Sequence, residues 1–252
     1  MNKTVLITGA TSGIGLATAR IFAQNNYRLI ICGRRADRLK ELEEELSSQT
    51  EIASLSFDVR DNAAVTEKIG SLAAPFNEID ILINNAGNAH GLSTVQEGSL
   101  EDWDAMIDIN VKGLLYVSKA IVPGMVERGR GHVINIGSIA GKEVYGKGTV
   151  YCASKFAVDA ISTGMRIDLN ANGIKVSEVK PGAVDTEFSL VRFKGDKERA
   201  DSVYDGFTPL SAEDVAEVIY FVASRPPHVN IADSIVFPTA QASVSVFNRS
   251  GD

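Results

Sequence analysis

Two side chains able to move a proton, Tyr151 and Lys155, stand four residues apart at the start of an amphipathic pattern. Four residues make about one helical turn, so both side chains should lie on one face of a helix. A free tyrosine has a pKa of about 10, but a nearby ammonium stabilises the phenolate and lowers that pKa. The pair therefore predicts a tyrosine that acts as a general acid or base, although the same spacing also arises by chance on half-exposed helices.

Two further polar residues, Ser138 and Asn110, occupy positions that suggest a role beside this pair. The apolar run 132–136 predicts a strand, and Ser138 follows its end. Ser138 and Tyr151 could each donate a hydrogen bond to one carbonyl oxygen as a hydride reaches its carbon, but a serine at a strand end is also ordinary. Asn110 lies within a long helical pattern over residues 103–122. Because asparagine has a poor helix propensity, a compensating function is expected there.

The segment of strand, glycine turn and helix near the start of the chain is typical of dinucleotide binding. Residues 4–8 form a β-branched run, residues 9–15 have the spacing Gly-x-x-x-Gly-x-Gly, and an apolar-periodic segment follows. Glycines let the loop turn tightly and approach a pyrophosphate, while the N-terminal amides of the helix face the anion. The spacing differs from the commoner Gly-x-Gly-x-x-Gly, so a plain strand-to-helix turn is the alternative. The predicted coenzyme contacts here are Gly9, Thr11, Ser12, Gly13, Ile14 and Gly15.

The end of the next predicted strand, residues 28–32, indicates the choice of coenzyme. In dinucleotide folds an acidic residue about 20 positions beyond the glycine loop binds the ribose hydroxyls of NAD. This chain has Arg34 and Arg35 there instead, and guanidinium groups suit a 2′-phosphate. We therefore predict NADP rather than NAD. Asp37 is the rival ligand for a ribose, but it is better placed to cap the helix that follows.

Three more predicted strands end in residues that could contact the same coenzyme, because parallel sheets bind ligands at the carboxyl ends of their strands. The strands are predicted at residues 52–57, 79–83 and 175–179. Asp58 could accept a hydrogen bond from the adenine amino group or serve only as a turn residue. Asn84 and Asn85, which follow the strand over residues 79–83, could simply tie a loop to that strand. The predicted contacts are Asp58, Val59, Asn85, Ala86, Gly87, Pro181, Gly182, Val184 and Thr186, together with Tyr151 and Lys155.

Strand and helix patterns alternate along the whole chain, which predicts an α/β fold. We expect one domain over residues 1–252, with a Rossmann-type, doubly wound and mostly parallel sheet of about seven strands. Residues 186–210 are expected to form a lid over the substrate. The tail, residues 239–252, has no clear pattern, so it either docks on a neighbouring subunit or frays.

Composition excludes several classes of function. The net charge of −7 and the lack of a Lys/Arg-rich run argue against a nucleic-acid partner. The first apolar run is too short for a signal peptide, and no later run approaches the length of a membrane span, so a cytoplasmic protein is expected. Cys32 and Cys152 fit reduced thiols better than a disulfide framework. We predict no metal site.

Taken together, these residues resemble the short-chain dehydrogenase/reductase superfamily, in particular its three-glycine branch. The motifs follow the order and spacing of that family over nearly the whole chain: Thr8-Gly9-x-x-x-Gly13-x-Gly15, Asn84-Asn85-Ala86-Gly87, Asn110, Ser138, Tyr151-x-x-x-Lys155 and Pro181-Gly182.

The resemblance implies a role for each of four residues. Tyr151 would be the acid/base, and Lys155 would bind the nicotinamide ribose and lower the tyrosine pKa. Ser138 would orient the substrate carbonyl, and Asn110 would hold a proton-relay water. The family also implies a homotetramer in which the helices that contain Asn110 and Tyr151 pack across subunits.

The carboxyl-terminal third resembles NADP-dependent 3-hydroxy acid dehydrogenases, which oxidise L-allo-threonine, serine and related short 3-hydroxy acids. The likeness is carried by residues 186–196, 209–216 and 229–239. In the predicted lid, Arg192 and Lys194 could each meet a substrate carboxylate, or both could be exposed charges. We expect the substrate to contact Arg192, together with Ser138 and Tyr151.

Two other functions share these motifs. A reductase of a 3-oxoacyl thioester on a carrier protein would use the same catalytic residues, but it would need a basic docking patch. The candidates for such a patch near the lid are Arg192, Lys194, Lys197 and Arg199. A redox-sensing module that holds NADP without catalysis would be favoured by loss of the tyrosine or the lysine, and both are present.

Overall fold

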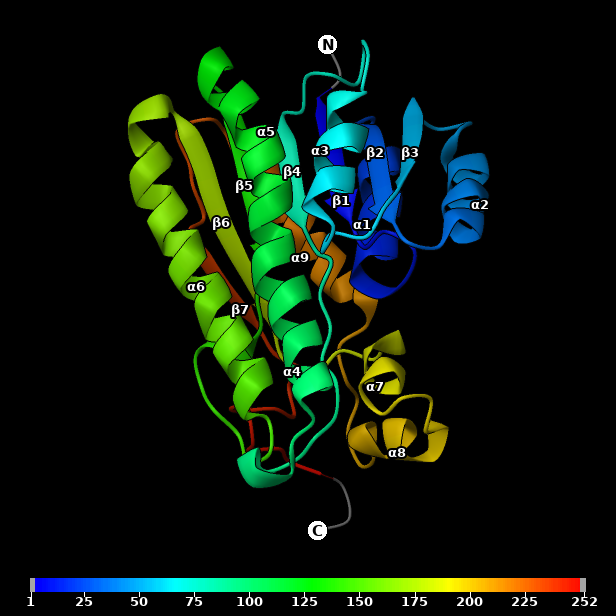
Figure 1. Cartoon of the computed structure of the whole chain (residues 1–252), viewed down its shortest axis with the longest axis vertical. Helices are drawn as coiled ribbons and strands as arrows, with labels where there is room; N and C mark the ends of the chain where they lie inside the picture. Colours follow the sequence, from blue (N-terminus) through cyan, green and yellow to red (C-terminus); the bar gives the residue numbers. More distant parts are fainter. Residues whose placement is uncertain (1–2, 250–252) are drawn as a thin grey trace.

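The computed structural model describes residues 3–249 and contains a seven-stranded sheet in the order β3-β2-β1-β4-β5-β6-β7, with every neighbouring pair parallel (Figure 1). The strands are β1 (Thr4–Thr8), β2 (Arg28–Gly33), β3 (Ile52–Ser56), β4 (Ile81–Asn84), β5 (Gly131–Ile136), β6 (Ile174–Pro181) and β7 (Asp233–Val236). The predicted fold class and strand number are confirmed. The strand order reverses between β1 and β4, which is where such sheets bind ligands.

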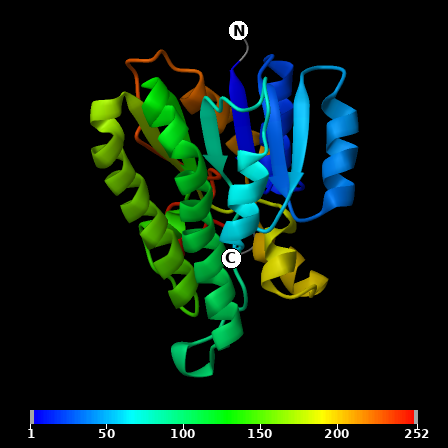
Figure 2. The same ribbon diagram turned by 45° about the horizontal axis from the view of Figure 1, so that its top comes forward.

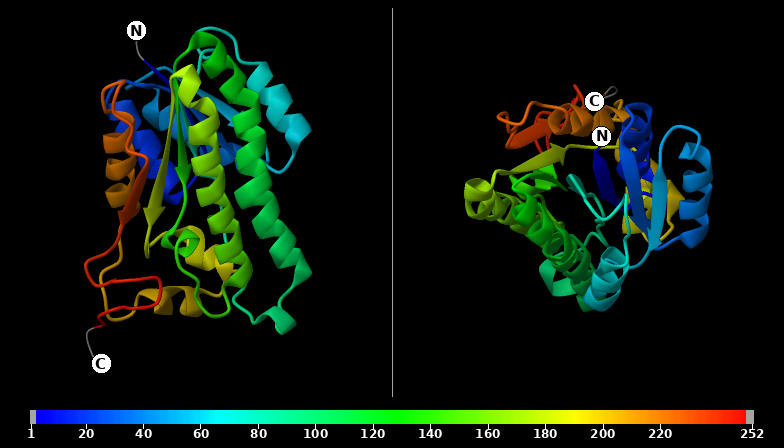
Figure 3. Two further views of the ribbon diagram at one scale, coloured as in Figure 1. Left: turned by 90° about the vertical axis from the view of Figure 1, so that its left-hand side faces the viewer. Right: turned by 90° about the horizontal axis from the view of Figure 1, so that it is seen from above.

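Helices cover both faces of this sheet, as the view from above shows (Figure 3). One layer holds α1 (Gly13–Gln24), α2 (Ala36–Leu46) and α9 (Ala212–Ala223), and the other holds α3 (Asn62–Gly70), α5 (Leu114–Arg128) and α6 (Thr149–Leu169). In β1, Val5 and Ile7 pack into the first core while Leu6 packs into the second. Since side chains alternate along a strand, burial on both faces explains the continuous apolar runs.

The long helical pattern over residues 103–122 is interrupted in the structure. A helix α4 (Leu100–Ile107) runs into a π-helical turn, η2 (Asp108–Gly113), before α5 begins. Asn110 lies within that turn and is buried. Isolated π turns inside helices occur often at functional sites, so the wide turn accounts for an asparagine at this position.

The segment predicted as a lid stands apart from both helical layers, at the carboxyl ends of the strands (Figure 2). It contains α7 (Glu187–Arg192), α8 (Lys197–Asp201) and the 3₁₀ turn η5 (Ser202–Tyr204). The remaining 3₁₀ turns are η1 (Val95–Glu97), η3 (Ile139–Gly141) and η4 (Asn170–Asn172). Among the described residues, no helix combines the length and apolarity needed to cross a membrane.

Residues 239–249 do not fray, because they fold back onto their own chain, and docking of the tail on a neighbouring subunit stays a prediction. The amide of Ala242 donates to the carbonyl of Val246 at 2.9 Å, and the amide of Asn248 donates to Ala240 at 2.7 Å. Gln241 anchors this turn, because its Oε1 accepts a hydrogen bond from the Ala183 amide at 2.8 Å. The last three residues of the predicted tail, 250–252, lie outside the described part of the chain.

Candidate active site

A cavity of about 340 Å³ opens at the carboxyl ends of β1 and β4. The structure places nearly all of the predicted coenzyme contacts in its wall: Gly9, Thr11, Ser12, Gly13, Ile14, Arg34, Arg35, Asp58, Val59, Asn85, Ala86, Gly87, Tyr151, Lys155, Pro181, Gly182, Val184 and Thr186. Gly15 has a different place, behind the loop. A Cβ atom there would stand 2.3 Å from the carbonyl oxygen of Gly9, so this glycine allows the helix to pack closely against the strand.

The glycine loop has the form that a pyrophosphate requires. Gly9 and Gly13 have positive φ angles of 68° and 50°, which favour glycine. Within residues 3–249, the side chain of Ser12 makes no capping hydrogen bond at the start of α1, so the first amides of that helix remain available to an anion. The residues present therefore fit the phosphates of a dinucleotide.

The two arginines predicted to select NADP lie at one end of this cavity. Arg35 is held in place from both sides: its Nη2 donates to Ser12 Oγ and to Thr11 Oγ1, both at 2.8 Å, and its Nη1 lies 2.9 Å from Glu187 Oε2. Arg34 is more exposed, at 59%, and its Nη1 lies 3.7 Å from Asp58 Oδ2. The fork of Arg35 is thus oriented before any ligand arrives.

Glu187 was not identified from the sequence, although it links α7 to these arginines. It opens α7 and accepts from both Arg35 and Arg38, the latter at 2.7 Å. Partial burial opposes ionisation, but the hydrogen bonds from the two arginines hold the pKa of Glu187 below its usual value. A carboxylate therefore lies beside the guanidinium groups that a phosphate would contact.

Two acidic residues near the arginines differ in how well they were predicted. The prediction that Asp37 caps the following helix is wrong, because Arg35 is the residue that precedes α2 and Asp37 lies inside its first turn. Asp58 is a turn residue in the structure, and its contact with the adenine amino group stays a prediction. It accepts from the backbone amide of Arg60 at 3.0 Å, as a turn residue does, and it also lines the cavity.

Tyr151, Lys155 and Ser138 meet at the opposite end of the cavity. Tyr151 is 8% exposed, and its ring centre lies 5.7 Å from that of Phe188 in α7. Ser138 follows β5 and lines the same cavity beside Tyr151. Lys155 comes from the next turn of α6, where its Nζ donates to the carbonyl oxygen of Ile136 at 2.9 Å. The structure thus brings together three groups that are far apart in the chain.

The pKa of this tyrosine is set mainly by burial. Burial raises the pKa of Tyr151 above its ordinary value, and the nearby Tyr145 acts in the same direction. The Ser138 hydroxyl and the charge of Arg192 oppose this rise. The expected lowering by Lys155 is therefore not the dominant effect here, because the ammonium is turned towards Ile136 and burial lowers its own pKa to about 8.

Asn110 is held by three hydrogen bonds to the protein. Its Oδ1 accepts from the amide of Asn88 at 2.9 Å, and its Nδ2 donates to the carbonyl of Asn88 at 2.8 Å and to Ser154 Oγ at 2.9 Å. A Cβ atom on Gly87 would lie 3.0 Å from Asn110 Oδ1 and 3.6 Å from Lys155 Nζ. Asn110 therefore braces the loop after β4 against α6, close to the ammonium.

A second, smaller recess of about 20 Å³ adjoins the large cavity and shares Tyr151 with it. Arg192 lines this recess and its guanidinium carbon lies 5.4 Å from the ring centres of both Tyr151 and Tyr145. Arg192 also hydrogen-bonds the hydroxyl of Tyr145. Lys194, the other cation considered for the substrate, instead pairs with Asp102 at 2.9 Å.

Tyr145 is a second residue that the sequence did not single out. Its ring lies against Gly148, where a Cβ atom would stand 2.2 Å from the ring. A tyrosine followed three residues later by glycine, just before the predicted catalytic helix, is the only signal in the sequence, and it is a weak one. Among the described residues, no group of acidic, histidine and cysteine side chains could hold a metal ion.

Comparison with known proteins is consistent with this geometry. A family described as short chain dehydrogenase matches residues 3–196. The chain is 47% identical over 239 residues to the NADP-dependent 3-hydroxy acid dehydrogenase YdfG of Salmonella typhi, covering 94% of this chain and 96% of that protein. It is 46% identical over 243 residues to sulfoacetaldehyde reductase 2 of Chromohalobacter salexigens, with 96% of each covered. The closed form of a serine dehydrogenase complexed with NADP+ superposes with a TM-score of 0.92 at 45% identity, over 98% of this chain and 99% of that one.

Proposed function

Because the chain belongs to the short-chain dehydrogenase family, we propose that it transfers hydride between NADP and the 3-hydroxyl carbon of a short 3-hydroxy acid. The substrate class includes L-allo-threonine, serine and 3-hydroxypropionate. The observation that carries this proposal is the position of Arg192, whose guanidinium lies over the ring of Tyr151 and lines the same recess. A substrate that reacts at the tyrosine hydroxyl would therefore have a cation within reach of its carboxylate.

Tyr151 accepts the hydroxyl proton during oxidation and donates it during reduction. The coenzyme, when bound, supplies the carbon that accepts or donates the hydride. Ser138 donates a second hydrogen bond to the reacting oxygen and so fixes its position. Because burial raises the pKa of Tyr151, the phenol is protonated at neutral pH. The positive charge of Lys155 is needed to lower this pKa enough for the phenol to lose its proton.

Coenzyme selection follows from the arginines at the far end of the cavity. Arg35, oriented by Thr11 and Ser12, can bind two phosphate oxygens with its fork, and the exposed Arg34 adds a second charge. Relatives whose names specify NADP support the same choice. Asp37 as a ribose ligand is disfavoured, because it belongs to the first turn of α2.

Arg192 and Tyr145 supply the anion site for the substrate. The guanidinium is half-buried between two aromatic rings, so it meets an anion with fewer competing waters than an exposed arginine would. A sulfonate would satisfy the same cation, and the likeness to sulfoacetaldehyde reductase 2 makes a two-carbon sulfonate aldehyde the second candidate substrate. A 3-oxoacyl carrier thioester has no carboxylate at that place.

Initial rates decide among these functions. The purified protein should be assayed with NADP+ and NAD+ on L-serine, L-allo-threonine and 3-hydroxypropionate, and with NADPH on sulfoacetaldehyde and a 3-oxoacyl thioester. We expect kcat/KM to be largest for a 3-hydroxy acid with NADP+. A larger value for the thioester would overturn the substrate class, and equal rates with both coenzymes would overturn the arginine argument.

The proposal extends to assembly and location. Apolar side chains are exposed on two neighbouring helices, Leu115 on α5 and Phe156 and Ile167 on α6, at 41%, 39% and 72%. These faces support a homotetramer, which mass photometry would report as four times the mass of one chain. Cys32 and Cys152 are both buried free thiols, a state that suits the reducing cytoplasm.

A further inference from the structure

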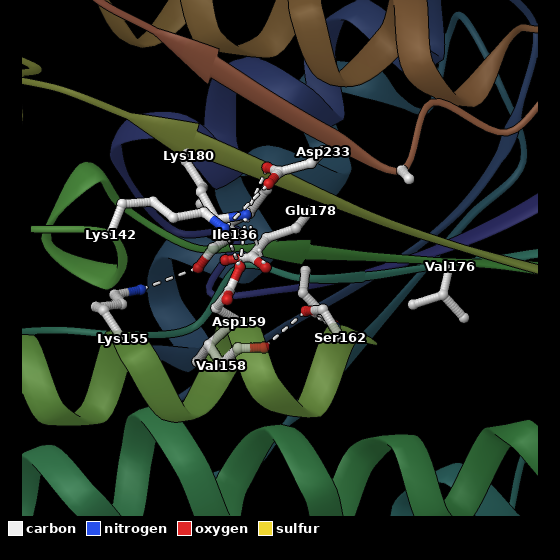
Figure 4. Close-up of polar contacts among 12 residues, drawn as sticks. Ile136, Lys142, Lys155, Val158, Asp159, Ser162, Val176, Glu178, Lys180 and Asp233 are labelled. Carbon is white, nitrogen blue, oxygen red and sulfur yellow. Dashed lines mark hydrogen bonds and ion pairs between the residues drawn. The ribbon is translucent and has the colours of Figure 1, made fainter. Parts of the chain in front are cut away.

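A cluster of five charged side chains lies behind the catalytic lysine, between α6 and the strands β6 and β7 (Figure 4). Lys180 is at its centre, 1% exposed, with its Nζ 3.0 Å from Asp159, 3.0 Å from Glu178 and 2.5 Å from Asp233. Lys142 reaches Asp159 and Asp233 from the outside, at 3.0 and 3.4 Å. Three carboxylates thus face two ammonium groups, so the cluster carries an excess of negative charge.

One carboxylate oxygen of Glu178 lies on the side away from the other charges of the cluster. Its Oε2 pairs with Lys180, but its Oε1 is buried and has no hydrogen-bond partner among residues 3–249. A Cβ atom on Gly137 would stand 2.1 Å from this oxygen, so the carboxylate lies directly against the backbone after β5. An unpaired buried oxygen of this kind is costly and calls for an explanation.

The backbone that Glu178 touches is also the backbone that holds Lys155. Lys155 Nζ donates to the carbonyl of Ile136, the residue just before Gly137. Lys155 is 7% exposed, and burial lowers its pKa to about 8, while the charge of Glu178 acts in the opposite direction. A negative charge therefore stands near a buried ammonium that has only a carbonyl as its direct partner in the described chain.

Helix α6 connects the same cluster to the catalytic residues. Tyr151, Lys155 and Asp159 follow one another at four-residue intervals and so share one face of the helix. Asp159 joins this face to Lys142 and Lys180. Burial raises the pKa of Glu178 above its ordinary value, and the Lys180 ammonium 3.0 Å away limits that rise.

We propose that Glu178 is a positioning residue for the reaction, whose buried carboxylate keeps Lys155 charged and held against the backbone carbonyl of Ile136. Other charges near the lysine have partners of their own, since Asp159 and Asp233 are each shared between Lys180 and Lys142. Arg192 acts on Tyr151 from the lid side. The catalytic meaning rests on the proposed function, but the charge effect itself does not.

The test measures the titration of Lys155 directly, by NMR of protein labelled with ¹³C at the lysine Cε, with the signal assigned from Lys155→Met. We expect Glu178→Gln to lower the midpoint by about one pH unit, a tenfold weaker hold on the proton. Asp233→Asn is the matched control, because it removes the same charge from the same cluster at a side chain that is 39% exposed. In this control the Lys155 midpoint should stay within about 0.2 pH units of the wild-type value.

Three outcomes would overturn the proposal: an unchanged midpoint in Glu178→Gln, an equal shift in both variants, or a rise. Glu178→Asp serves as the second variant, since it keeps the carboxylate but moves it back by one methylene. The titration midpoint of Lys155 should fall less in this variant than in Glu178→Gln. In turnover assays, Glu178→Gln should move the alkaline limb of the kcat profile to lower pH and leave KM for the hydroxy acid unchanged. A midpoint shift without any hydroxy acid turnover in the wild type would contradict the proposed function alone.

Discussion

Two groups of paired charges lie at opposite ends of the active-site region, and they differ in their access to water. At the mouth, Arg35, Arg38 and Glu187 are each about 40% exposed. Behind the catalytic lysine, Lys180 and Glu178 are each 1% exposed. Exposed ion pairs contribute about 0–1 kcal/mol, because water competes for both partners. Breaking a buried pair costs about 3–5 kcal/mol, because one charge is left desolvated.

The difference indicates what each group is for. The exposed arginines can exchange Glu187 for another anion at little cost, so they suit a ligand site. The buried lysine cannot exchange its three carboxylates without unfolding part of the molecule, so it suits a fixed scaffold. The comparison would fail if changes to the buried group altered coenzyme affinity, or if changes to the exposed group altered stability.

The largest effect is expected from Lys180→Met. This change leaves three carboxylates around an apolar side chain, so the free energy of unfolding should fall by about 3–5 kcal/mol in urea denaturation. Arg38→Met is the control at the exposed group, and its effect should stay below about 1 kcal/mol. Equal losses in the two variants would remove the distinction between the groups.

Lys155 is a third case beside the exposed and the buried ion pairs, because its buried ammonium has a carbonyl rather than a carboxylate as its direct partner. Its pKa is lowered from 10.5 to about 8, so the folded state holds this proton less tightly than the unfolded chain does. Stability due to Lys155 should therefore rise as pH increases from about 8 to about 10.5, by up to about 3 kcal/mol. The check is the difference in unfolding free energy between wild type and Lys155→Met across that window, and a difference that is flat or falling would contradict it.

At the exposed group, Arg35→Ala should weaken NADP binding by about 2 kcal/mol, or roughly 30-fold, because charge-assisted hydrogen bonds to the phosphate are lost. Binding of NAD and the free energy of unfolding should change little. Isothermal titration with both coenzymes measures this, and an equal loss for NAD would show that Arg35 supports the loop rather than the phosphate.

The smallest effect is expected from Glu187→Gln. The change removes the carboxylate that competes for Arg35 and Arg38, so NADP should bind about 2–5-fold more tightly, with NAD unaffected. Weaker NADP binding in this variant would mean that Glu187 helps to orient the arginines instead of occupying them.

The sequence was informative wherever a role depends on local spacing. The β-branched runs predicted the buried strands, and the glycine loop, Ser138, Tyr151 and Lys155 were placed correctly on their elements. Residues that act through distant contacts could not be found. Glu187 meets Arg35 across 152 positions, and Glu178 pairs with Asp233 on a neighbouring strand, where Lys180 bridges their side chains. Local propensity was also misleading at Asp37, because the helix begins two residues earlier than a cap at Asp37 implies.

We propose that the Tyr151 hydroxyl moves the proton in a reaction whose coenzyme is held mainly elsewhere. The most direct measurement is the turnover of Tyr151→Phe on a 3-hydroxy acid, together with its affinity for NADP. The buried ring and its contact with Phe188 are kept in this variant, so we predict a loss in kcat of at least about 10²–10⁴-fold with an NADP affinity within about threefold of wild type. Turnover at the wild-type rate by the phenylalanine variant would contradict the account.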